Sequence, residues 1–124
     1  MRARFVLAVL AVLSVGACDS GPAGPGEVEG RVSAPALGAA LLEVEGSGIN
    51  GFSGRGATQV YSAPLQGRPG VYRVIVLDRA GGELGFAIDV DDRGMEGPVV
   101  TVIQATDTGN LPISAGGVSV SLVR

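Results

Sequence analysis

The chain has 124 residues, with twelve acidic and nine basic residues and a formal net charge of −3. All basic residues are Arg, and the acidic excess argues against nucleic-acid binding, which needs clustered cations to displace counterions from phosphates. His and Trp are absent and Cys occurs once, which excludes His-dependent catalysis, Cys/His zinc sites and an internal disulfide.

The first eighteen residues have the layout of an export signal. Arg2 and Arg4 form a short positive segment, and residues 5–15 form an apolar run. A helix needs about 20 apolar residues to cross a bilayer, so this run is too short for a permanent span but suits a secretory signal. The dipeptide at 16–17 is Gly-Ala, and Cys18 follows it.

This order of charge, short apolar run, two small residues and Cys resembles the lipobox of bacterial lipoproteins. The resemblance implies that the Cys18 thiol carries lipid and that residues 1–17 are a cleaved signal peptide. Two or more acyl chains hold a protein firmly at a membrane, so the lipid would be a sufficient anchor. An ordinary signal peptide followed by a chance Cys and a cytosolic protein with an apolar N-terminus are the alternatives.

Residues 18–26 are predicted to be the lipidated Cys and a tether. The segment 19–26 is rich in Gly and Pro and has no apolar periodicity, so regular structure is not expected there. Eight extended residues reach at most about 28 Å, which would keep the folded domain close to the membrane.

From residue 27 onward, apolar residues alternate with polar ones, the pattern of strands with one wet face. Residues 71–77 are apolar at nearly every position, which predicts a central strand covered on both faces. Residues 49–56 are rich in Gly and are predicted to be irregular. Strands are predicted at 27–32, 40–45, 58–63, 71–77, 83–90, 99–105 and 118–122.

The fold class follows from the number and spacing of these strands. After the signal peptide, no segment shows the apolar stripe of an amphipathic helix. Short strands separated by turns every 8–12 residues are typical of two packed sheets. The sequence therefore predicts one all-β domain over 27–124, an antiparallel β-sandwich of about seven to eight strands.

The stretch 38–44 and the strand pair 71–77 and 83–90 look like a reduced form of cohesin-like sandwiches, which are relatives of carbohydrate-binding sandwich folds. Cohesins bind a dockerin partner through one sheet face. No residue here maps to that face, so the resemblance implies a fold and no partner. The sequence Cys-Asp-Ser at 18–20 is also similar to the mature start of small uncharacterised lipoproteins.

The most concentrated polar cluster is acidic. Asp89, Asp91 and Asp92 supply oxygen ligands of the kind that Ca²⁺ prefers, and they are weak candidates for a metal site. An EF-hand loop starting at the first of them would need ligands where Arg93 and Val100 stand. A solvated acidic loop is the interpretation that the sequence favours.

The remaining candidate sites for phosphate binding, catalysis and glycan binding are weak. The glycines within 46–56 do not open a helix, so they are not expected to bind phosphate. Glu43 and Glu45 share one strand face and could in principle form a carboxylate pair, but an exposed face is the simpler interpretation. Tyr61 and Tyr72 are the candidates for stacking on a glycan.

We therefore expect a non-enzymatic protein without a cofactor, lipid-anchored in the inner or outer membrane of a bacterial cell envelope, with its domain in the periplasm or at the cell surface. Its expected role is contact with a protein partner in the envelope. The outward faces of Glu27–Val32 and Gly117–Val123 are the predicted contact surfaces. A glycan- or Ca²⁺-binding module is the alternative.

Overall fold

The computed structural model describes residues 24–124, so Cys18 and the predicted signal peptide lie outside the described residues. The described chain forms nine β-strands and one three-residue 3₁₀ helix, η1 (Ala115–Gly117). The strands are β1 (Gly26–Ser33), β2 (Leu37–Glu45), β3 (Ile49–Gly54), β4 (Gln59–Pro64), β5 (Val71–Leu77), β6 (Glu83–Val90), β7 (Val99–Asp107), β8 (Pro112–Ile113) and β9 (Ser119–Val123).

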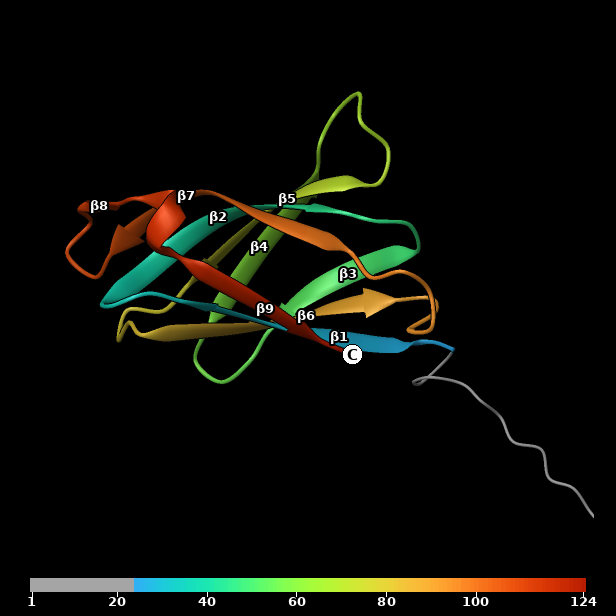
Figure 1. Cartoon of the computed structure of the whole chain (residues 1–124), viewed down its shortest axis with the longest axis horizontal. Coiled ribbons are helices and arrows are strands. Elements are labelled where there is room, and N and C mark those ends of the chain that lie inside the picture. Colours follow the sequence, from blue (N-terminus) through green and yellow to red (C-terminus); the bar gives the residue numbers. More distant parts are fainter. Residues whose placement is uncertain (1–23) are drawn as a thin grey trace, which may run out of the picture.

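The strands form two sheets that pack against each other (Figure 1). One sheet has four strands in the order β3-β6-β1-β9, and the other has five in the order β4-β5-β2-β7-β8. All neighbouring strands are antiparallel. The predicted all-β antiparallel sandwich is confirmed, with nine strands in the described residues where about seven to eight were expected.

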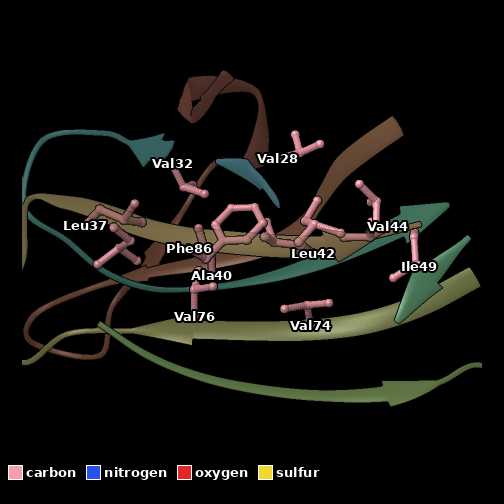
Figure 2. Packing of buried hydrophobic residues seen from close by; sticks show 14 residues of the cluster. Val28, Val32, Leu37, Ala40, Leu42, Val44, Ile49, Val74, Val76 and Phe86 are labelled. Atoms are coloured by element: carbon pink, nitrogen blue, oxygen red, sulfur yellow. The ribbon is translucent and has the colours of Figure 1, made fainter. Parts of the chain in front are cut away.

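The core lies between the sheets and is built from alternate residues of the strands. Phe86 of β6 is fully buried at its centre and lies opposite Gly30 of β1. A Cβ at position 30 would lie 2.6 Å from Cε1 of the Phe86 ring, so the glycine leaves the space that the ring fills. The fully buried large side chains, several of them labelled in Figure 2, are Val32, Leu37, Leu42, Val44, Val74, Val76, Leu84, Phe86 and Ile88.

The prediction of irregular structure at 49–56 is wrong for its first part, because Ile49–Gly54 form β3 and pair with β6. The register shifts between Ile49 and Gly51, which marks a β-bulge or similar irregularity. Glycine weakens the intrinsic strand preference of this segment, and pairing with a long neighbouring strand overrides that preference.

The prediction that 71–77 is covered on both faces is also wrong. Val74 and Val76 of β5 are fully buried against the core, but Ile75 between them is 42% exposed. Arg73 also lies on the outer side of this strand. The outer side of the five-stranded sheet is therefore open at Ile75, whereas Val71, at the start of β5 on the same side, is buried.

The described chain begins at one end of the sandwich, which we call the entry end. The Gly24 N–H donates to Asp92 Oδ1 at 2.9 Å, and the Gly24 carbonyl accepts from the Arg93 N–H at 2.8 Å. Glu45, the last residue of β2, pairs with Val99, which follows the loop that holds Gly24. Among the described residues, no helix has the length and apolar character that a membrane span requires.

Candidate interaction surface

Three largely apolar side chains and one amide side chain line up across the outer side of the five-stranded sheet. We call these four the apolar row. The strand register places Tyr61 of β4 beside Ile75 of β5, Ile75 beside Leu41 of β2, and Leu41 beside Gln104 of β7. Tyr61 is 58% exposed, and Leu41 is half-buried. Contiguous exposed apolar side chains are candidates for contact with a partner, so this row is a candidate contact surface.

A second row continues the apolar character farther from the entry end. It consists of Leu77 and Ala39, which are paired across β5 and β2 and are both half-buried. A shallow hollow of about 200 Å³ lies at this level, lined by Ala39, Leu41, Ile75 and their neighbours on β7. The two rows together give an apolar centre about two residues deep along the strands.

A charged row borders this centre on the side of the entry end. Arg73 and Glu43 are cross-strand partners, and their side chains form an ion pair of 3.3 Å. Arg68, from the loop after β4, lies 3.4 Å from Glu43 and 3.8 Å from Glu45. An apolar centre with a polar rim, in which Tyr and Arg are present, is a composition common at protein interfaces. We call the three rows together the interaction face.

The charged row also contains Glu43 and Glu45, the candidates for a catalytic carboxylate pair. Glu43 and Glu45 lie on the outer side of the sheet, as predicted, although the Glu43 side chain is only 19% exposed because it contacts two guanidinium groups. Glu45 is exposed and contacts Arg68. Both carboxylates thus have cationic partners within the chain, an arrangement that serves an ion-pair network better than acid–base work.

The outer side of the four-stranded sheet has a different character. Strands β1 and β9, which carry the predicted contact surfaces Glu27–Val32 and Gly117–Val123, lie side by side in this sheet. Arg31 forms an ion pair of 3.2 Å with Glu83, and Arg55 pairs with the Glu residues at 27 and 29. This surface therefore carries polar groups that are paired within the chain, together with the exposed Val123 of β9, which lies beside Glu29.

The two tyrosines point in opposite directions and do not form one platform. Tyr72 packs against the core, edge to face with Phe52 at a centroid distance of 5.5 Å, and its hydroxyl donates to the Ile49 carbonyl at 3.4 Å. Tyr61 remains on the interaction face as an exposed ring. A glycan could therefore stack on Tyr61 alone.

Two of the three acidic residues that were candidates for calcium accept hydrogen bonds within the chain. Asp91 accepts from the Asn50 amide at 2.7 Å, and Asp89 is exposed on β6. Asp92 accepts from the N–H groups of Gly94 and Gly24, and these bonds, the former first, hold the pKa of its carboxyl below the ordinary value. Within residues 24–124, no group of three or more acidic, His or Cys side chains is placed to hold a metal ion.

An open cleft at the entry end contains part of the Gly-rich segment. It lies between the turn at 46–48 and the loop that ends at Gly70, and Glu45 and Tyr72 also line it. Half of its eight lining residues are glycine or proline. Cys18, the predicted lipidation site, lies outside the described residues.

Comparison of the chain with protein-family models, with characterised proteins and with solved structures found no match. The residues of the interaction face are thus identified by geometry. Sequence reasoning missed Ile75 and Leu77 as surface residues, because it interpreted the unbroken apolar run 71–77 as burial on two sides. The same run is the signal that could have indicated a contact face.

Proposed function

We propose that the protein is a lipid-anchored, non-enzymatic binding module of a bacterial cell envelope that contacts a protein partner through its interaction face. The observation that carries this proposal is the exposed apolar row, with Tyr61 58% and Ile75 42% exposed on the outer side of a sheet. The lipid anchor at Cys18 is proposed from the order of residues in the first eighteen positions.

The composition of the face supports a protein as the ligand. Aromatic residues and Arg are enriched at protein interfaces, and the face combines Tyr61 with Arg68 and Arg73. Binding would remove the half-exposed Leu41 and Ile75 from water, at a gain of about 25 cal/mol for each Å² of apolar surface. The charged row would form the polar rim on one side.

The anchor is tested by mass spectrometry of the protein isolated from membranes of the producing bacterium. We expect a peptide that begins at Cys18 and carries diacylglycerol, and a Cys18→Ser variant that leaves the membrane fraction. An unmodified thiol on an unprocessed chain would refute the anchor.

The face is tested by photo-crosslinking from single positions in the intact envelope. A crosslinking amino acid at Ile75 should give a discrete crosslinked protein species, and the species should disappear when Leu41→Lys is introduced. Ser121 on β9, at the outer side of the opposite sheet, is the matched control position and should give no such species. Equal crosslinking from both positions would contradict the proposal.

Glycan binding through Tyr61 is the second candidate, favoured by its exposed ring beside the apolar hollow. Stacking of a sugar on this ring would be lost in Tyr61→Ala and retained in Tyr72→Phe, because Tyr72 packs against the core. If the wild-type protein binds to a glycan array and the Tyr61→Ala variant does not, the result would support this function over the first.

A further inference from the structure

The three rows of the interaction face are complementary to the same rows after a two-fold rotation, and this indicates its partner. We infer that the face binds a second copy of this chain, related by a two-fold axis that runs parallel to the strands between β5 and β2. The inference deepens the proposed function and rests on it, since it assigns the partner of the same face.

The charged row is complementary to itself under this rotation. The axis exchanges β5 with β2 and leaves each row at its own height. Arg73 of one copy then faces Glu43 of the second copy, and the reciprocal contact forms at the same time, as two-fold symmetry requires. Each Glu43 carboxylate, which already contacts Arg68 and Arg73 of its own chain, gains a third guanidinium.

The apolar rows are complementary in the same way. Ile75 faces Leu41 of the second copy, so aliphatic side chains meet at the centre. In the next row, Leu77 faces Ala39, a large residue against a small one. At the margins, Tyr61 faces Gln104, whose amide can accept a hydrogen bond from the phenol.

The alternative two-fold axis, perpendicular to the strands through the apolar row, gives a poor interface. It would lay the charged row of one copy on the second row of the other. Arg73 and Glu43 would then be covered by Leu77 and Ala39, which offer no partner for charges that lose their water. The arrangement of rows therefore selects the parallel axis.

The membrane anchor favours the same axis. A parallel axis places Gly24 of both copies at one end of the dimer, and the six steps from Cys18 to Gly24 reach about 20 Å. A perpendicular axis would place the two entry ends about 30 Å apart along strands the length of β2, so both tethers would reach one membrane only if the strands lay along its surface. Shared anchoring also raises the effective concentration of the second copy, which favours association through a face of modest size.

The experiment uses two full-length copies with different affinity tags, produced together in a bacterium that lipidates them and purified after gentle solubilisation of the membrane. Wild-type copies should purify together. Arg73→Glu gives a face with two acidic positions in the charged row, and Glu43→Arg gives a face with two basic positions. Each variant paired with itself should lose at least ten-fold in co-purification, because like charges then oppose each other.

The decisive arm combines the two variants. A copy with Arg73→Glu faces a copy with Glu43→Arg so that every acidic position meets a basic one, and co-purification should return to within two-fold of wild type. The matched control makes the same charge changes on the other sheet, with Arg31→Glu and Glu83→Arg, and should leave association unchanged in every combination. Circular dichroism of each variant confirms that it is folded, and Ile75→Lys, which leaves the charges in place, should also abolish association.

Three results would overturn the inference: wild-type copies that do not purify together, variant pairs that associate as well as wild type, or mixed variants that fail to recover. The anchor is measured separately by mass spectrometry at Cys18. A lipidated protein whose copies do not associate overturns the inference and leaves the proposed function standing. Copies that associate without lipid at Cys18 overturn the anchor, and with it the membrane argument for the axis.

Discussion

The contact between Phe86 and Gly30 offers the sharpest test of how this sequence specifies its core. In Gly30→Ala the new Cβ would meet the Phe86 ring, at 2.6 Å from Cε1 and 3.0 Å from Cε2, well inside van der Waals contact. The ring is fully buried between the sheets and cannot swing into solvent. Overpacking of this kind costs about 1–3 kcal/mol of the free energy of unfolding.

The expected magnitude is large for a single methyl group. In a domain of about 100 residues, 1 kcal/mol shifts the melting temperature by about 4–8 °C, so Gly30→Ala should lower it by roughly 4–24 °C. An alanine in a strand interior otherwise gains about 0.5–1 kcal/mol over glycine. The cost should therefore vanish or reverse in a Phe86→Leu background, where the ring is absent.

The assay is a double-mutant cycle from urea unfolding followed by circular dichroism. We expect Gly30→Ala to destabilise the wild-type protein and to be neutral or stabilising in the Phe86→Leu protein, with a coupling free energy of about 1 kcal/mol or more. An equal cost of Gly30→Ala in both backgrounds, or no cost in either, would refute the role assigned to this glycine.

Three further predictions concern polar contacts, each read from unfolding measurements. Glu43→Gln should cost about 1–2 kcal/mol, because hydrogen bonds to a half-buried charged group are worth more than exposed ones, while Glu83→Gln should cost about 0–1 kcal/mol; equal costs would contradict the geometry. Thr58→Val should cost about 1–3 kcal/mol, since it removes the acceptor of the Gly85 N–H at 3.2 Å, whereas Thr58→Ser should be nearly neutral; a similar loss in both would show that packing decides. The lowered pKa of Asp92 means that its stabilisation is present above the ordinary carboxyl pKa of about 4 and is lost as pH falls through the lower folded value. Asp92→Asn should therefore be less stable than wild type at pH 7, and the difference should shrink in acid; a constant difference across pH would contradict the assignment.

The sequence carried the fold class with few ambiguities, because strand periodicity is a local property. The alternation of Val28, Gly30 and Val32 with polar residues predicts which side of β1 enters the core, and the structure confirms it. The Gly-rich segment 49–54 resisted prediction, since its strand structure depends on pairing with β6 and hardly on its own residues.

The candidate functional features also include one part that the sequence alone could predict and one part that it could not. Local order alone was enough to propose an export signal and a lipidated Cys18, because such signals are read as linear sequence. The interaction face needed the tertiary structure. Leu41 and Ile75 are 34 positions apart in the chain, and only the register of β2 with β5 places them side by side.

An apolar run by itself cannot distinguish a strand covered on both sides from one that leaves an apolar side open to a partner. That distinction depends on whether a second layer covers the outer side of the sheet, which is a property of the whole fold. Hydrophobic periodicity therefore determined most strands of this protein, and the packing of its two sheets decided which apolar residues remained exposed.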